Sequence, residues 1–599
     1  MLKVVCGEIQ IEVEVKIEEK NFSSATVEII RTFFVHESSN INIFAIYEKH
    51  SMNDILIGII SSTDSSTTFS ITSSDDNIFH EAIDKKVAII IVDTLTSFTK
   101  FQDTFLSCKK IAKNGFFLII FPNATSQDLK KMFLLLWENF IYNVASLTID
   151  ENLIGMFTFF PFSQKLHCNN AFAVKINEYN GQHWMSEKFY PEKFKDLKAC
   201  QIRVGTFETE PSVMRKVVND NKTKVYGSEV DVLLGMSDLM NFTPIFHFYI
   251  KSSGDIYENG TSTGLMNKLM RKKEDVVIGF LSLMYSRAKF LSATTAFTYE
   301  PLAIVIPPGG YFTAFEKLYF PFSTFVWILL ILMLIATIFV VLITRLCFNN
   351  LYAFLVGDNI KTPLLNFFLI VYGLAQHQLP KRNFARYLIM NLMLFFLIIR
   401  NYYQGVMFQF LQTELRRPDI ASIDELIKED FNFYVYKTLE SRTKGHPFYN
   451  RRVVIEMNEI EKIRNKTLNP KFKGALFNYM TQVFYLNQLN YKEFSYRICK
   501  EKFLSNPMVF YFQKDFYLVN EFNDKMNDLK ENGLINLWIS KYVDKRFTNQ
   551  KETLVGALPL NVHHLLAIFE LWIGGLVISF IIFILEHSTV KHFKLFLSR

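Results

Sequence analysis

Four polar side chains interrupt an apolar stretch and are the residues whose types and spacing most clearly suggest a chemical role. Arg400, Asn401, Gln404 and Gln409 directly follow the lipid-like run LIMNLMLFFLII at 388–399. Polar groups at membrane depth are costly unless they face a partner helix or water. The pattern therefore indicates a pore-lining helix, with Arg400 and Gln404 as candidate pore or gate residues. In a different helix register, Arg400 would instead extend its aliphatic stem to the membrane interface.

The sequence gives no clear motif for catalysis or for metal or cofactor binding. It has no Gly-rich phosphate loop and no HExxH motif. With a formal net charge of +7 and no basic block alternating with aromatics, it also gives no sign of nucleic-acid binding. The cysteines form no CxxC pair and no zinc-site spacing with His, so their pairing cannot be assigned: Cys6, Cys108, Cys168, Cys200, Cys347 and Cys499. We expect neither an enzyme nor a bound metal or cofactor.

Three long apolar segments are expected to place the polar groups within a membrane. Half of the 599 residues are hydrophobic and 61 are Phe, yet 21% are charged, so the apolar excess must lie in a few places. Each segment supplies the roughly 20 residues that cross a ~30 Å hydrocarbon core. We expect membrane spans at 322–346, 386–412 and 562–586. Glu570, inside the last span, is expected to hydrogen-bond to another helix.

A shorter apolar run, PLLNFFLIVYGLA at 363–375, lies between the first two spans. It is too short to cross a membrane but suits a re-entrant pore loop, which we expect at 361–380. Gln376 follows the run and is a candidate for the selectivity constriction. A re-entrant loop begins and ends on one side, so the segments before the first span and after the middle span must share the opposite side.

Glycosylation acceptors and basic residues indicate which side that is. Asn-x-Ser/Thr acceptors occur only in the two long segments, at Asn21, Asn123, Asn221, Asn241, Asn259 and Asn465. The short linkers beside the re-entrant run and the tail at 587–599 are basic instead, as expected of cytoplasm. Their charges are Arg345, Lys361, Lys381, Arg382 and Arg386 against Asp358, then Lys591, Lys594 and Arg599. We expect a multi-pass plasma-membrane protein with its long segments extracellular and glycosylated.

The long segments have α/β patterns. Residues 1–198 alternate short apolar runs with helical stretches and are expected to form a reduced amino-terminal α/β region without an assignable site. The first apolar run is too short for a signal peptide, so translocation would use a later signal or a longer start. Strand and helix patterns follow from Cys200 and resume between about 420 and 543. One α/β domain is therefore interrupted by the membrane segments.

The order of these parts resembles the ionotropic glutamate receptors and, among them, the divergent arthropod ionotropic chemoreceptors, over about residues 200–587. Similar motifs occur in the family's order: Gly227 and Asp231 before VLL, FLSLMYSRAKFLSATTAF (280–297), YFPFSTFVW (319–327), YQGVMFQFL (403–411) and LKENGLINLW (529–538). The resemblance implies a bilobed, periplasmic-binding-protein-like α/β ligand domain split by α-helical membrane segments, with three spans and a re-entrant pore loop. Its two parts are expected at 199–318 and 413–558.

The same resemblance implies roles for particular residues. Arg287 takes the place of the Arg that grips the ligand carboxylate, and Ser282 replaces a ligand-contacting Thr. The segment TLESRTK, with Thr443, resembles the ligand loop of the second lobe; an ordinary helix start is the alternative for it. A surface Arg paired with a carboxylate is the alternative for Arg287.

Departures from the family pattern narrow the expected function. Residues 462–492 contain no Asp or Glu to hold a ligand amine, and the gate helix carries Arg400 instead of a run of small residues. The resemblance thus implies a chemosensory ligand-gated cation channel subunit, opened by an anionic or polar small molecule other than glutamate. It would assemble with co-receptor subunits in a heteromeric, tetrameric channel. The alternative is a non-conducting cell-surface binding or scaffold protein with the same plan.

Overall fold

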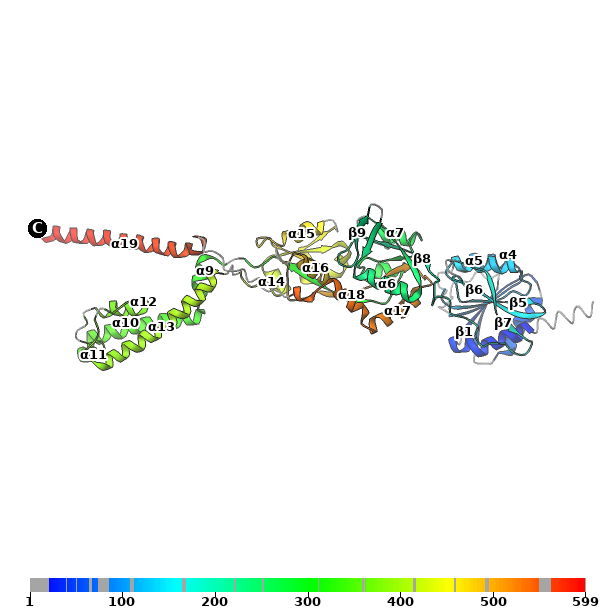
Figure 1. The fold of residues 1–599 in the computed structure, drawn as a ribbon, viewed down its shortest axis with the longest axis horizontal. Helices are drawn as coiled ribbons and strands as arrows, with labels where there is room; N and C mark the ends of the chain where they lie inside the picture. Colours follow the sequence, from blue (N-terminus) through cyan, green and yellow to red (C-terminus); the bar gives the residue numbers. More distant parts are fainter. Residues whose placement is uncertain are drawn as a thin grey trace, which may run out of the picture.

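The chain forms an elongated molecule with three parts in sequence along its length: an amino-terminal domain, a two-lobed domain and a group of long helices (Figure 1). The computed structural model describes residues 21–38, 40–49, 51–63, 67–73, 86–107, 113–163, 168–219, 222–249, 253–310, 312–357, 360, 362–376, 378–412, 416–456, 459–490, 495–548 and 562–597. This part excludes Cys6, Cys108, Asn221 and Asn359.

The amino-terminal domain is built on a seven-stranded sheet with the order β2-β1-β3-β4-β5-β6-β7. Its strands are β1 (Asn40–Ile46), β2 (Thr68–Ser73), β3 (Val87–Val92), β4 (Phe116–Ile120), β5 (Val144–Asp150), β6 (Leu153–Phe159) and β7 (Ala173–Tyr179). The first five strands are parallel and the last two antiparallel. Helices α3 (Ser51–Ser62), α4 (Leu95–Ser107) and α5 (Ser126–Glu138) connect them. Both faces of β3 are buried, which explains its uninterrupted apolar sequence VAIIIV.

Aromatic side chains join the amino-terminal domain to the first lobe. Trp137 in α5 lies 4.6 Å from the ring of Tyr517, and Phe140 lies 5.3 Å from Phe516, measured between ring centroids. These residues belong to one continuous hydrophobic core that contains α5 and the strands of the first lobe. The two parts are therefore packed together and are not merely linked by a flexible segment.

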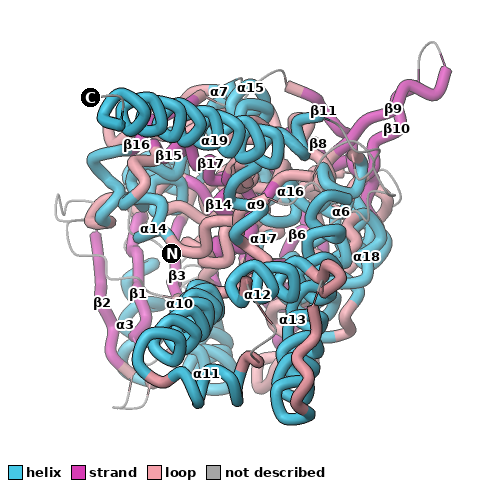
Figure 2. Tube along the Cα trace, turned by 90° about the vertical axis from the view of Figure 1, so that its left-hand side faces the viewer, coloured by secondary structure: helices cyan, strands magenta, loops and turns pink. Residues whose placement is uncertain are grey.

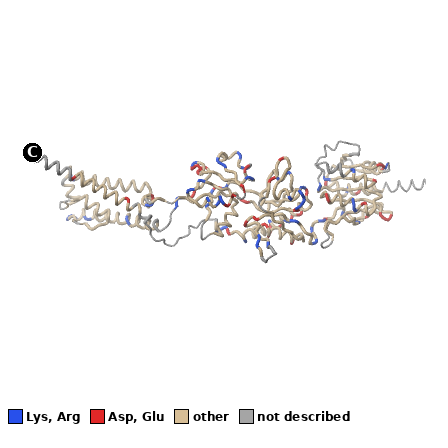
Figure 3. The backbone as a smooth tube through the Cα atoms, turned by 90° about the horizontal axis from the view of Figure 1, so that it is seen from above, with Lys and Arg blue, Asp and Glu red and all other residues tan. Residues whose placement is uncertain are grey.

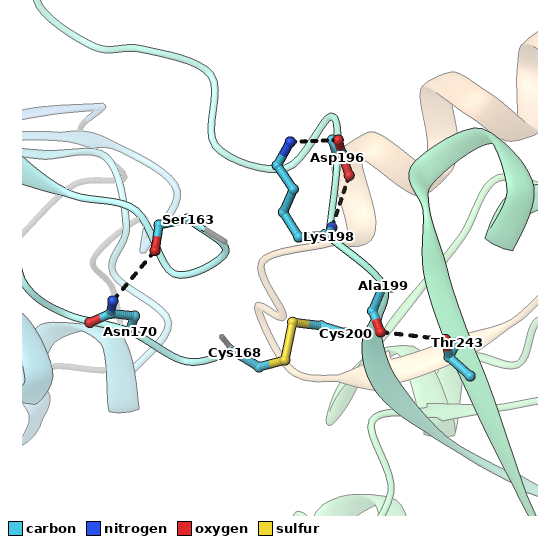
Figure 4. Close-up of a disulfide and its surroundings, with 8 residues drawn as sticks. All are labelled: Ser163, Cys168, Asn170, Asp196, Lys198, Ala199, Cys200 and Thr243. Carbon is cyan, nitrogen blue, oxygen red and sulfur yellow. Dashed lines mark hydrogen bonds and ion pairs between the residues drawn. A yellow bond between two sulfur atoms is a disulfide. The ribbon is translucent and has the colours of Figure 1, made fainter. Parts of the chain in front are cut away.

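A disulfide between Cys168 and Cys200 reinforces the same junction (Figure 4). Cys200 begins the first strand of the first lobe, whereas Cys168 lies in the amino-terminal domain just before β7. The sequence left this pairing open. Cys499 is a buried free cysteine and Cys347 an exposed one.

The first lobe has a five-stranded sheet with the order β11-β8-β12-β20-β13. The strands are β8 (Cys200–Thr206), β11 (Phe242–Phe248), β12 (Val276–Val277), β13 (Leu291–Ala293) and β20 (Tyr511–Gln513). Its helices are α6 (Ser228–Met240), α7 (Gly264–Met270), α8 (Tyr285–Ala288), α17 (Val519–Glu531) and α18 (Leu534–Tyr542). The hairpin β9 (Met214–Asn219) and β10 (Lys222–Tyr226) projects from it (Figure 2). Gly533 has φ of +74° and separates α17 from α18, a left-handed position that glycine adopts easily.

The second lobe has the strand order β16-β15-β17-β14-β18, and β19 also pairs with β14. The strands are β14 (Thr298–Ile306), β15 (Asn432–Tyr436), β16 (Arg452–Ile455), β17 (Gly474–Tyr479), β18 (Arg497–Ile498) and β19 (Leu504–Met508). Its helices are α14 (Ile423–Lys428), α15 (Ile460–Lys466) and α16 (Met480–Leu489), with the 3-10 helices η2 (Lys437–Thr443) and η3 (Pro447–Arg451). Strand β14 precedes the membrane helices in sequence and the other strands follow them, so the domain is bilobed and split, as predicted.

Two extended segments cross between the lobes. The N–H groups of Thr294 and Phe297 donate to the carbonyls of Phe510 and Met508, each at 3.0 Å. These paired backbones lead from the first-lobe strands into β14 and β19 of the second lobe. We call these two paired segments, 294–297 and 508–510, the hinge.

Among the described residues, three helices are long and apolar enough to cross a membrane, in agreement with the predicted fold class. They are Thr324–Cys347 in α10, Asn383–Gln409 in α13 (Asn383–Gln412) and Ile568–Glu586 in α19 (Val562–Leu597), with mean hydropathies of 3.3, 1.4 and 2.5. Acidic and basic residues cluster on the lobes and are rare along these helices (Figure 3). The short helices α9 (Ala314–Tyr319), α11 (Asn349–Leu355) and α12 (Pro363–Tyr372) flank α10 and precede α13; η5 (Lys545–Thr548) follows α18.

Candidate functional site

A pocket of about 510 Å³, including the space that opens to solvent, lies between the two lobes. The first lobe lines it with Phe207, Thr209, Ser253, Gly279, Phe280, Leu281, Ser282, Met284 and Arg287, and the second lobe with Tyr436, Tyr479 and Gln482. Among these residues none is acidic, and Arg287 supplies a positive charge. The pocket therefore favours a ligand with an anionic or hydrogen-bond-accepting group.

Arg287, the predicted carboxylate-gripping residue, lies in α8 on the first-lobe wall of the pocket and is 3% exposed. One terminal nitrogen, Nη2, donates to Ser253 Oγ at 3.1 Å and to the Gly254 carbonyl at 3.0 Å. The guanidinium also lies 5.8 Å from the centroid of the Tyr511 ring. No carboxylate pairs with it in the part of the chain described, so a surface ion pair does not account for its position. These contacts fix the orientation of the side chain, and the hydrogen bonds to Ser253 and Gly254 both use Nη2.

Ser282 lines the same pocket, whereas Thr443 does not. Ser282 is buried, and its carbonyl accepts a hydrogen bond of 2.9 Å from the Tyr511 hydroxyl. Thr443 is buried at the end of η2, where its hydroxyl donates to the Glu440 carbonyl at 2.7 Å. The structure therefore brings together two of the three predicted ligand residues and leaves Thr443 in a local helix contact.

The second-lobe wall consists of hydroxyl and amide groups that the sequence did not reveal. The Tyr436 hydroxyl donates to Asn478 Oδ1 at 2.9 Å, and burial raises the pKa of both Tyr436 and Tyr479. Asn478 is fully buried, and its Nδ2 has no partner among the described residues. The Tyr479 ring meets Phe280 of the first lobe edge to face at 5.1 Å. This wall offers neutral polar groups to a ligand, in agreement with the absence of acids from 462–492.

A buried carboxylate, also missed from the sequence, supports the first-lobe wall. Glu229 lies in the first turn of α6, and its Oε2 accepts the N–H groups of Gly279 at 3.1 Å and Phe280 at 2.6 Å. Its Oε1 has no partner among the described residues. Burial raises the pKa of Glu229 to about 7, although the two backbone hydrogen bonds oppose that shift. Glu229 therefore holds two pocket residues through a group that titrates near neutral pH.

The predicted pore residues lie around α12 and α13. Arg400 places its guanidinium against Gly373, the residue with φ of +71° that ends α12, and a methyl group there would overlap it. A helix C-terminus favours a cation, which explains how α13 accommodates this charge. Gln376 Nε2 donates back to the Asn366 carbonyl at 3.0 Å, and Gln404 is exposed on α13. The structure brings Arg400 and Gln376 to the same end of α12, whereas Gln404 is exposed farther along α13.

The segments that connect the second lobe to α10 and α13 are bonded to each other. The Arg417 N–H donates to the Gly310 carbonyl at 2.9 Å, and its guanidinium pairs with Glu316 at 2.8 Å. Asp419 accepts the Gly309 N–H at 3.2 Å. Motion of the second lobe would therefore act on both helices together.

The predicted glycosylation acceptors that the structure describes lie on the amino-terminal domain and the two lobes. Asn123, Asn241, Asn259 and Asn465 are exposed, and Asn21 is partly buried. None of the five lies on a candidate membrane helix.

Comparison with known proteins agrees with this geometry. Residues 13–196 match the family described as "Putative ionotropic receptor, ligand binding domain", and residues 200–309 match "Ligated ion channel L-glutamate- and glycine-binding site". The chain is 23% identical to a glutamate receptor of Lymnaea stagnalis and 24% identical to human glutamate receptor ionotropic, delta-2, over 42% and 50% of its length. These matches cover 29% and 28% of the relatives, less than a third of their length. The chain thus carries ligand-binding domains of the ionotropic glutamate receptor type and is a distant relative of glutamate receptors.

Proposed function

We propose that this chain is a subunit of a ligand-gated cation channel in the plasma membrane, opened when its two lobes close on a small molecule. The observation that carries this proposal is the interlobe pocket with Arg287 on its wall, in a domain interrupted by apolar helices. The matched receptor-type domains support the same function and no enzymatic one. Resemblance to divergent arthropod receptors further supports a chemosensory role.

The proposed mechanism starts with an anionic or polar ligand that bonds to Arg287 and Ser282 and draws the second lobe toward the first. Because the second lobe joins both α10 and α13, its rotation would pull the paired segments at Gly310 and Arg417 and separate the gate helices. A change from 1:99 to 99:1 open requires about 5.5 kcal/mol of differential binding, which several subunits would share.

The direct test is ligand-evoked current from cells that express this chain with candidate co-receptor subunits. We expect a cation current that appears only when this chain is present and that depends on the agonist. A chain that reaches the cell surface and binds ligand, yet adds no current in any combination, would indicate the binding or scaffold function instead.

We predict heteromeric assembly, since α13 carries Arg400 where the family pattern has small residues. Four symmetry-related Arg400 side chains would repel each other in a homomer. The chain expressed alone should give little current or surface protein, and a co-receptor should restore both. Surface biotinylation and whole-cell recording measure these quantities. Robust homomeric currents would contradict the prediction.

We also predict an extracellular ligand domain and a cytoplasmic loop between α10 and α13. Glycosidase treatment should increase the electrophoretic mobility of the protein, and Asn259→Gln should remove part of that change because Asn259 is exposed. An acceptor created at Asn359 by Lys361→Thr should remain unmodified. Glycan at Asn359 would disprove the pore-loop topology.

A further inference from the structure

One arginine that the sequence did not single out reaches from the second lobe to the first. Arg442 lies in η2, next to Thr443, and is partly buried. Its Nη2 donates to the Leu283 carbonyl at 2.6 Å, and its Nη1 donates to Asn506 Oδ1. A single side chain of the second lobe therefore contacts two other segments at once.

The two acceptors, Leu283 and Asn506, lie where the first-lobe wall of the pocket meets the hinge. Leu283 belongs to the first lobe and lies between the pocket residues Ser282 and Met284. Its own N–H donates to the Pro507 carbonyl at 2.9 Å. Asn506, beside Pro507, lies in β19, which continues into the hinge. Arg442 therefore joins η2 to the edge of the first-lobe wall where that wall meets the hinge.

The chemistry of Arg442 suits a contact between lobes. Its planar guanidinium presents several N–H groups in fixed directions, so it can bond to two separate acceptors, and a bond from a charged donor is roughly twice as strong as a neutral one. Its charge also reaches the pocket, since it lowers the pKa of the Tyr479 and Tyr511 hydroxyls against the larger effect of burial, which raises both. Neither recorded acceptor is a carboxylate, so the positive charge of Arg442 is not neutralised there.

We propose that Arg442 is a positioning residue for ligand binding, which holds the second lobe against the first at the edge of the pocket so that the closed cleft forms. The proposal rests on the proposed function, in which ligand binding drives closure of the cleft. Arg442 acts through the arrangement of the lobes and not through contact with the ligand. Arg442 should therefore contribute equally to the binding of anionic and of neutral ligands, in contrast to Arg287.

The test measures the separation of the lobes in the ligand-free full-length protein, so it requires neither an agonist nor a current. Spin labels are placed through noncanonical residues at Lys289 on the first lobe and Lys471 on the second, both exposed. Labelled chains are diluted with unlabelled ones, and pulsed electron resonance gives the distance distribution. Arg442→Ala is expected to shift the distribution to longer distances, and Arg442→Lys, which keeps the charge but not the two-acceptor geometry, should shift it partly.

Arg451→Ala is the matched control, because Arg451 also lies in the second lobe but pairs with Asp430 of the same lobe, outside η2, at 2.8 Å. It should leave the distribution unchanged. Asn506→Ala should reproduce part of the Arg442→Ala shift, which tests the second-lobe contact that orients the Arg442 side chain. Unchanged distances in both Arg442→Ala and Arg442→Lys, or an equal shift in Arg451→Ala, would overturn the proposal. A failure of the channel function would appear separately, as absent current in a protein with normal lobe distances.

Discussion

Arg287→Ala is expected to shift the agonist dose–response curve to higher concentration by about 10- to 150-fold. A hydrogen bond to a charged group contributes roughly 1.5–3 kcal/mol, and each 1.4 kcal/mol corresponds to a tenfold change in affinity. Arg287 can offer its Nη1 and Nε edge to a ligand because only Nη2 bonds to Ser253 and Gly254. Arg287→Lys should recover only part of the loss, since an ammonium cannot form two parallel bonds. Recordings from cells with a co-receptor and the best available agonist measure the shift.

Lys289→Ala provides the control for this prediction, because Lys289 is an exposed cation two residues away. It should leave the curve in place, and surface expression should be equal for all variants. An unmoved curve for Arg287→Ala, or best agonists that are simple amines, would show that Arg287 does not grip an anion.

Glu229→Gln is expected to make the protein more stable than wild type at pH 8. At pH 5 the difference in stability between variant and wild type should be much smaller. Burial raises the folded-state pKa of Glu229 from 4.5 to about 7, so the folded protein favours the protonated form. Stability from this group is fully present below pH 4.5 and is lost as the pH rises through about 7. The shift corresponds to about 3 kcal/mol at 1.36 kcal/mol per pKa unit. Glutamine cannot ionise, so the Glu229→Gln variant does not lose this stability as the pH rises.

Thermal unfolding of the solubilised full-length protein at pH 5, 6, 7 and 8 tests this expectation. The comparison between variant and wild type cancels the titration of other groups, such as Lys193, whose pKa burial lowers to about 7. Glu258→Gln, at an exposed position, should follow the wild type at every pH. A constant difference between Glu229→Gln and wild type over this range would show that Glu229 does not titrate there. Because Glu229 holds Gly279 and Phe280, agonist potency should also vary with pH in wild type and less in the variant.

The three spans could be predicted because crossing a bilayer is a property of one continuous segment. The most apolar stretch of α10 carries its mean hydropathy of 3.3 in the sequence itself. The first-lobe wall of the pocket could also be predicted from the sequence, since Ser282 and Arg287 are five positions apart in one motif. Where a function depends on a short segment, its residues can be recognised before the fold is known.

The remaining parts of the site depend on contacts between distant segments. Glu229 is 51 positions from Phe280, Tyr436 is 42 from Asn478, and Arg442 is 159 from Leu283. No local pattern distinguishes these residues from other buried polar groups. The pairing of Cys168 with Cys200 was equally inaccessible, because four other cysteines were available as partners. For Thr443, the motif match selected the wrong residue of the segment: its neighbour Arg442 is the residue whose side chain reaches across the cleft.

The continuous core and the disulfide between the amino-terminal domain and the first lobe have a mechanical consequence. Together they tie the amino-terminal domain and the first lobe into one unit. In the proposed mechanism, the second lobe would move relative to this unit, and the bonded segments at Gly310 and Arg417 would transmit its motion to α10 and α13 together. Without the disulfide between Cys168 and Cys200, the amino-terminal domain and the first lobe could move relative to each other. The same lobe closure would then transmit less force to the gate helices.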